Sequence, residues 1–312
     1  MVTIKDMLDS GVHFGHQTQR WNPKMKPYVF GDRGGIHIID LQKTLEMTKT
    51  ALAAIEEQAA QGKKIIFCGT KKQAVEAVQE AANKCGGFYM TKRWLGGTLT
   101  NFVTIKQSID RLKKIDQMRD KGELEYFSKK ERSQIEKEYG KLNEFLEGIR
   151  DMKEPPGMIF IVDVTKEHIA VKEAQNLGMN VFGICDTNSD PEEIEYPIPG
   201  NDDAIRSIKL FCNLVADAYN KGAKKWEQKL RTMTDKQSDV EAEEKSKAKK
   251  DNTKDAGGPA VVKAAKGRKL VAAGTADEIE IMQEVEASAT DDEGPDKVIV
   301  ADTDPDADKK KD

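Results

Sequence analysis

Short runs of consecutive apolar residues alternate along the chain with longer segments of helical periodicity. The three clearest runs cover residues 64–69, 158–163 and 180–185, and each is apolar on both faces rather than at every second position. Strands buried between two layers of helices have this pattern. We therefore predict three central strands of a parallel sheet.

Segments with apolar residues three and four positions apart lie between and beside these runs, which predicts helices. Such strand–helix alternation is typical of an α/β domain with helices on both faces of the sheet. The predicted helices cover residues 40–61, 71–85 and 166–177, and a fourth from about Asp202 to Gly222. Residues 88–90 predict a further short strand, and residues 194–198, followed by Pro199, an edge strand.

Two long helical patterns, residues 102–121 and 128–152, interrupt this rhythm because no strand separates them. Ser128 and Glu131 form a capping-box motif at the start of the second pattern. Each has a narrow apolar stripe and many charges elsewhere, which favours antiparallel pairing as a coiled coil. We predict a protruding helical hairpin over residues 102–152, inserted between residues 1–101 and 153–230 of the globular domain.

The charge is unevenly distributed. Residues 231–312 hold 15 Lys and Arg and 21 Asp and Glu, a net charge of −6, which leaves +2 for residues 1–230. Weak periodicity and high charge predict a disordered acidic tail over residues 231–312. The four cysteines form no CxxC pair, which favours buried free thiols in a reducing compartment. With no secretory signal pattern and no membrane-length apolar run, we expect a cytoplasmic protein.

Two loops combine positive charge with aromatic residues. The first contains Arg20, Trp21, Lys24 and Lys26, followed by Arg33. Cations of this kind contact phosphates and aromatic rings stack on bases, although a solvated basic loop has the same composition.

The second loop, residues 91–101, contains Lys92, Arg93 and Gly96-Gly97. Its free amides could bind phosphate. The alternative, which we favour, is a glycine hinge into the hairpin with Trp94 and Leu95 as packing anchors.

Other polar clusters carry less weight. Asp186 and Asp190 follow a predicted strand, where α/β proteins bind ligands, but the DTNSDP segment also suits a tight turn. His13 and His16 lack neighbouring cysteines, so we predict no metal site. The chain contains no GxGxxG, GxSxG or HExxH motif, which lowers the expectation of an enzyme.

Several segments, in order along residues 2–226, resemble the ribosomal protein S-two family of the bacterial small subunit. They are LDSGVHFGH (8–16), RWNPKMKPY (20–28), GIHIIDL (35–41), RWLGG (93–97), LTN (99–101), DTNSDP (186–191) and IPGNDDAIR (198–206). Two departures are Gly178-Met-Asn-Val181, where family members often have Pro-Val, and a long tail after residue 230.

The resemblance implies a flavodoxin-like parallel sheet with a protruding helical hairpin, and a non-catalytic structural role in translation. It also implies binding to 16S-type ribosomal RNA and to other small-subunit proteins, including docking of the messenger-RNA-capturing ribosomal protein S-one. No cofactor, small-molecule substrate or membrane contact is implied.

Our hypothesis is electrostatic docking on RNA phosphates. The expected contacts are Arg20, Trp21, Lys24, Lys26, Arg33, Lys92, Arg93, Lys106, Arg111, Lys113 and Lys114. Two alternatives remain: a nucleotide-binding enzyme using Thr70, Asp163 and Asp186, and a coiled-coil adaptor that binds only protein.

Overall fold

A five-stranded parallel sheet forms the centre of the computed structural model, which describes residues 2–251, with side chains through residue 232. Its strand order is β5-β4-β6-β7-β8, which is the 2-1-3-4-5 order of flavodoxin-like folds when the strands are counted along the chain. The strands are β4 (Ile65–Cys68), β5 (Phe88–Met90), β6 (Met158–Val162), β7 (Asn180–Cys185) and β8 (Tyr196–Pro199). The central strands and the edge strand predicted from the apolar runs are confirmed.

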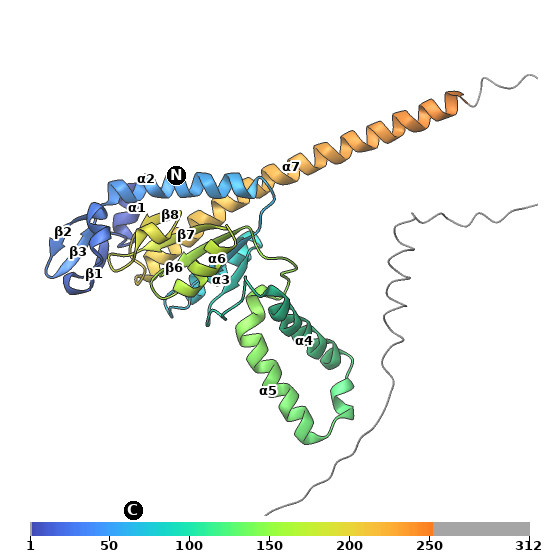
Figure 1. Cartoon of the computed structure of the whole chain (residues 1–312), viewed down its shortest axis with the longest axis horizontal. Helices are drawn as coiled ribbons and strands as arrows, with labels where there is room; N and C mark the ends of the chain where they lie inside the picture. The colour runs from blue at the N-terminus through green and yellow to red at the C-terminus, as the bar shows by residue number, and fades with distance from the viewer. Residues whose placement is uncertain (1, 252–312) are drawn as a thin grey trace, which may run out of the picture. The chain divides into compact units, whose positions relative to one another are not determined.

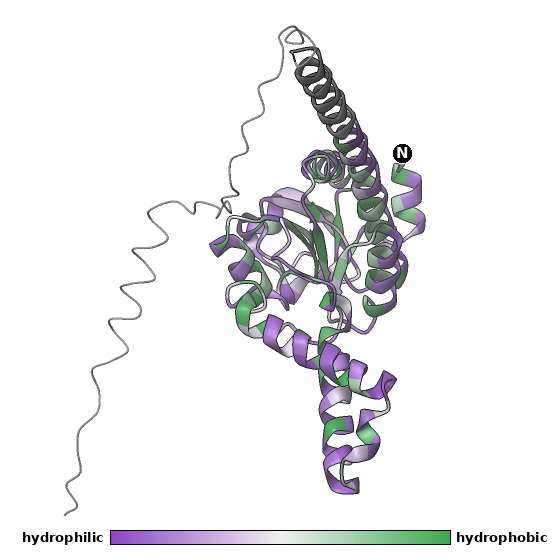
Figure 2. Ribbon diagram, turned by 90° about the vertical axis from the view of Figure 1, so that its right-hand side faces the viewer, coloured by the Kyte–Doolittle hydropathy of each residue, from purple (hydrophilic) through white to green (hydrophobic). Residues whose placement is uncertain are grey.

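Alternate residues of the strands enter two separate cores. Ile65 and Phe67 of β4 belong to one core with α2 (Leu41–Ala59), α3 (Val75–Cys85) and α7 (Ile205–Asp251). Ile66 and Cys68 face the other core, which also contains side chains of α6 (His168–Asn176). The parts of the two predicted hairpin helices that lie nearest the sheet pack into this core as well. Helices therefore cover both faces of the sheet, as the apolar runs predicted, and Figure 2 shows the apolar strands in the interior.

Helices α4 (Phe102–Asp120) and α5 (Lys129–Leu146) leave the sheet side by side (Figure 1). The 3-10 turn η3 (Glu123–Tyr126) connects α4 to α5, and a second 3-10 turn, η4 (Glu147–Ile149), follows directly after α5. The Ser128–Glu131 capping box is present at the start of α5. Most residues of the two helices are hydrophilic (Figure 2), and their coiled-coil geometry stays a prediction.

A second sheet near the amino terminus was not predicted from the sequence pattern. After α1 (Ile4–Asp9), the strands β1 (Phe14–Gln17), β2 (Val29–Arg33) and β3 (Ile36–Ile39) pair antiparallel in the order β1-β3-β2. The 3-10 turns η1 (Thr18–Arg20) and η2 (Pro23–Tyr28) lie between β1 and β2. The basic segment predicted as an irregular loop is therefore held between two strands.

The predicted end of the last helix at Gly222 is wrong, because α7 continues to Asp251. Gly222 instead allows close packing of α7 on α2, because a Cβ added there would clash with the carbonyl oxygen of Glu56. The first part of the predicted tail is thus helical, and residues 252–312, on which the rest of that prediction falls, lie outside the described residues.

Within the described range, no helix is both long enough and apolar enough to cross a lipid bilayer.

Candidate nucleic-acid interface

The amino-terminal basic segment docks on the DTNSDP turn through its backbone. The amide of Asn22 donates a hydrogen bond of 2.7 Å to the carbonyl of Thr187. Gly15 of β1 makes this approach possible, because a Cβ there would lie 2.6 Å from the Thr187 side chain. The turn predicted at residues 186–191 therefore serves as a platform for the basic segment.

The cations of this segment divide into paired and unpaired groups. Lys24 forms ion pairs of 2.7 Å with Asp190 and 2.6 Å with Glu192, so it fastens the segment to the turn. Among the described residues, Arg20, Lys26 and Arg33 have no carboxylate within ion-pair distance, and all three are exposed. The ring of Trp21 is partly exposed and lies 5.3 Å from that of His37.

A single buried carboxylate holds the second basic loop in place. Glu173 of α6 accepts hydrogen bonds from the amides of Gly97 (2.7 Å), Leu99 (2.9 Å) and Thr100 (3.2 Å). It also accepts one from the indole of Trp94, at 3.2 Å. The amides of Gly97, Leu99 and Thr100 are therefore already hydrogen-bonded within the fold, and the packing role of buried Trp94 is confirmed.

Burial raises the pKa of Glu173, but the hydrogen bonds from Leu99, Gly97, Thr100 and Trp94 outweigh burial and leave the pKa below its usual value. The side chain is thus held as an anion by the loop that surrounds it. Sequence reasoning missed this residue because it lies more than 70 positions from its partners. Nearby, Lys92 pairs with Glu144 at 3.4 Å, while exposed Arg93 has no such partner in the described part of the chain.

The cations predicted on the first helix of the hairpin also divide. Arg111 donates two hydrogen bonds, of 2.9 and 2.8 Å, to the Glu138 carboxylate on α5, and Lys113 pairs with Asp151 at 3.5 Å. Lys106 and Lys114 are exposed and have no ion-pair partner in residues 2–232. The second helix adds four exposed lysines that also have no ion-pair partner in residues 2–232. These lysines were not among the predicted contacts: Lys129, Lys130, Lys137 and Lys141.

A cluster of acidic side chains surrounds Lys71 at the carboxyl edge of the sheet. The ammonium nitrogen of Lys71 lies 3.0 Å from Asp163 and 2.8 Å from both Asp202 and Asp203. The Nδ1 atom of His16 lies 2.9 Å from Asp186. The edge where an enzyme of this fold would bind its ligand is thus occupied by the protein's own ion pairs.

One donor atom each of His16, Asp186 and Asp202 lie within 4.8 Å of one another. Nitrogen and carboxylate oxygen atoms of this kind could hold a divalent cation. This cluster was not predicted, because the three residues lie far apart along the chain and only the tertiary structure brings them together.

The pKa values of Asp202, His16 and Lys71 at this edge are all raised, in part by the neighbouring carboxylates. Burial raises the pKa of Asp202 to about 7, Asp186 and Asp163 add to the shift, and Lys71 opposes it. The hydrogen bond with Asp186 raises the pKa of His16 despite partial burial. Burial lowers the pKa of Lys71, but the surrounding carboxylates outweigh it and keep the ammonium charged.

Thr70, the third residue of the enzyme alternative, donates a hydrogen bond to Glu167. Thr70 and Asp163 are therefore both engaged in contacts within the fold.

The chain is similar in sequence to members of one protein family. The profile of a family described as "Ribosomal protein S2" matches residues 7–222. A small ribosomal subunit protein uS2 from Bdellovibrio bacteriovorus is 63% identical, over 94% of this chain and 98% of the relative. Proteins of the same name from Nitratiruptor and Geotalea uraniireducens are 55% and 53% identical, over 74% and 75% of this chain and 86% and 91% of their own lengths.

The Bdellovibrio alignment must extend beyond residue 251 to span 94% of the chain, so the carboxyl-terminal segment has a counterpart in that relative. The family match covers the sheet, the hairpin and the amino-terminal segment in one continuous range. The chain therefore belongs to the ribosomal protein S2 family and is a structural, non-enzymatic protein.

Proposed function

We propose that this protein is a structural constituent of the small ribosomal subunit in the cytoplasm, where it binds small-subunit ribosomal RNA and neighbouring ribosomal proteins. One observation carries the RNA part of the proposal. Six of the predicted contact residues are exposed cations with no carboxylate partner among the described residues, and they come from three separate segments: Arg20, Lys26, Arg33, Arg93, Lys106 and Lys114.

Unpaired cations favour RNA because phosphates release condensed counterions when lysine or arginine neutralises them. Paired cations gain less, since a carboxylate already neutralises them. Of the predicted set, we therefore assign phosphate contacts to the six unpaired residues, and bracing roles to Lys24, Lys92, Arg111 and Lys113. Trp21 is exposed enough to stack on a base or to close the loop over the RNA backbone.

Sedimentation of the tagged protein on sucrose gradients at low and high salt tests this proposal. We expect it to travel with small subunits at low salt and to be released as salt rises. A protein that stays at the top of the gradient in both conditions would contradict the ribosomal role. Survival of the complex after nuclease treatment would favour the protein-only adaptor.

A triple variant sharpens the test. With Arg93, Lys106 and Lys114 changed to Gln, the salt concentration that releases the protein should fall. A matched control changes Lys49, Lys172 and Lys224, which are also exposed and unpaired in the described structure. Equal release of both variants would argue against the assigned contacts.

We further propose that the amino-terminal sheet helps dock ribosomal protein S-one. Each of its three strands exposes a large apolar side chain, Phe14, Phe30 and Ile36, and Phe30 is 80% exposed. Exposed apolar groups next to polar ones are typical of protein-binding surfaces.

The docking proposal predicts that Phe30→Ser lowers the amount of S-one retained on small subunits, while this protein itself stays bound. Leu177→Ser, at another exposed apolar residue, is the control. Unchanged retention of S-one in the Phe30 variant would reject this surface.

A further inference from the structure

The two ends of the parallel sheet carry different clusters of charged side chains. The carboxyl edge gathers Asp163, Asp186, Asp202 and Asp203 around Lys71. The segments that lead into β4 and β6 at the amino edge contribute Lys63, Lys64 and Lys153 instead. Ligands usually bind open α/β sheets at the carboxyl edge, but here the acidic cluster around Lys71 lies at that edge, whereas these three lysines lie at the opposite end.

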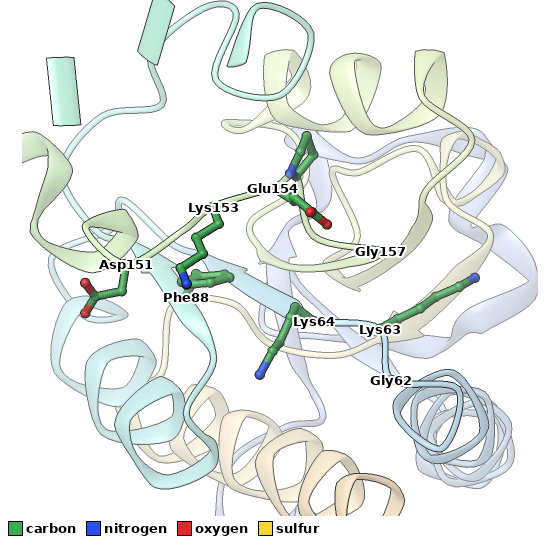
Figure 3. Close-up of a pocket in the computed structure, with 9 residues that line it drawn as sticks. Gly62, Lys63, Lys64, Phe88, Asp151, Lys153, Glu154 and Gly157 are labelled. Carbon is green, nitrogen blue, oxygen red and sulfur yellow. The ribbon is translucent and has the colours of Figure 1, made fainter. Parts of the chain in front are cut away.

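A cavity of about 480 Å³ lies at this amino edge, and we call it the amino-edge hollow (Figure 3). Its lining combines the three lysines with one aromatic ring and two acids: Lys63, Lys64, Phe88, Asp151, Lys153 and Glu154. The backbone of Gly62 and Gly157 completes the wall. The hollow is thus formed by three loops that enter neighbouring strands.

The lysines of the hollow are not neutralised within the described part of the protein. None of the three has a carboxylate within ion-pair distance there. Of the two acids in the lining, Asp151 is directed to Lys113 on α4, at 3.5 Å. The hollow therefore keeps a surplus of positive charge, which suits an anionic ligand.

The aromatic ring adds a second kind of contact. Phe88 is the first residue of β5 and is only half buried, and Figure 3 shows the Lys153 side chain extended toward its ring. Lys64 and Lys63 leave the chain in different directions on the other side of the hollow (Figure 3). A flat apolar surface between cations matches a nucleotide, whose base stacks and whose phosphates bind lysine.

We propose that the amino-edge hollow binds an unpaired nucleotide of small-subunit ribosomal RNA, with its base on Phe88 and adjacent phosphates on Lys63, Lys64 and Lys153. This inference rests on the proposed RNA-binding function but adds a contact region on the sheet itself, separate from the hairpin and the amino-terminal segment. A free nucleotide offers the same chemistry and is distinguished by the test.

The test measures binding of the full-length protein to ribosomal RNA extracted from small subunits, over a series of salt concentrations. Gln replaces all three lysines, because it keeps the aliphatic part of Lys63 that packs beside Gly157. Each lost phosphate contact reduces the magnitude of the slope of log affinity against log salt by about 0.7 to 0.9, so losing three contacts should reduce it by about 2 to 3. The control triple at Lys49, Lys172 and Lys224 should keep the native slope.

Two further measurements locate the ligand. Phe88→Leu should weaken RNA binding about tenfold with the slope unchanged, because stacking is lost and charge is not. RNA should protect Lys63, Lys64 and Lys153 from acetylation, detected by mass spectrometry, in the native protein. Thermal unfolding of each variant checks that the fold is retained.

The outcomes separate this inference from the proposed function. If the native protein binds RNA but the lysine variant keeps its affinity and slope, the inference fails and the proposed function stands. If the native protein does not bind RNA, both fail. If ATP alone protects the three lysines while the variant binds RNA normally, the hollow takes a free nucleotide, which overturns its assignment to RNA.

Discussion

Glu173 is the residue on which the loop before the hairpin depends. It is buried, and its carboxylate accepts hydrogen bonds from three backbone amides and an indole. Glu173→Gln replaces one acceptor oxygen by a donor that faces these amides. We expect a loss of about 2–3 kcal/mol in the free energy of unfolding, measured with urea. Glu57→Gln, at an exposed site on α2, should change little, and equal stability of the two variants would contradict the anchoring role.

Asp202 and His16 make stability depend on pH near neutrality. The pKa of Asp202 is raised from 3.8 to about 7, mainly by burial and to a smaller extent by the negative charges of Asp186 and Asp163. The folded state therefore binds a proton at Asp202 more tightly than the unfolded state does. Stability is therefore lost as pH rises through 7. The raised pKa of His16 acts in the same direction, because its contribution is complete below pH 6.5 and is lost above its folded pKa.

Urea unfolding with EDTA present should consequently show a lower free energy of unfolding at pH 8 than at pH 6. The contribution of Asp202 is roughly 1 kcal/mol. Asp202→Asn removes this titration, so its stability should change less across the same interval. A native protein more stable at pH 8 than at pH 6 would contradict the assignment.

At the scale of elements, the outer part of the hairpin depends on its own small core. Ile115 of α4 is fully buried yet belongs to neither core of the sheet. We expect Ile115→Ala to cost about 2–4 kcal/mol locally. Amide hydrogen exchange should then rise across residues 102–146 and stay unchanged in β6. Ile169→Ala, at an exposed position of α6, is the control, and faster exchange throughout the sheet would indicate that the hairpin does not open separately.

The elements also explain what the sequence could predict. The strands β4, β6 and β7 were predictable because burial on both faces makes every residue apolar. The strand β1, with sequence FGHQ, has no such pattern, because the Gly15 backbone packs against Thr187 and the His16 side chain contacts Asp186, about 170 positions away. Gly222 looked like a helix stop and is a close-packing site instead. The basic residues of the candidate interface were visible in the sequence, but their ion-pair partners depend on tertiary contacts.

At the scale of the whole molecule, charge is divided between the described part and the rest. Residues 252–312 hold 9 Lys and Arg and 15 Asp and Glu, a net charge of −6. A chain that ends at residue 251 should bind RNA several-fold more tightly at low salt, because the acidic segment no longer competes with phosphate. Filter binding should show this difference disappearing near 1 M salt, where charges are screened within about 3 Å. A difference that persists at high salt would reject the electrostatic explanation.

The Glu173 anchor has a mechanical consequence for the hairpin. The loop that it holds ends only two residues before α4 begins at Phe102, and a helix of 19 residues is about 28 Å long. A change of about 10° in direction at its start would displace its far end by roughly 5 Å, more than the length of a hydrogen bond. The buried carboxylate next to the start of α4, together with the packing of Ile105 and Ile109 in the core, thus fixes where the lysines farther along this helix lie.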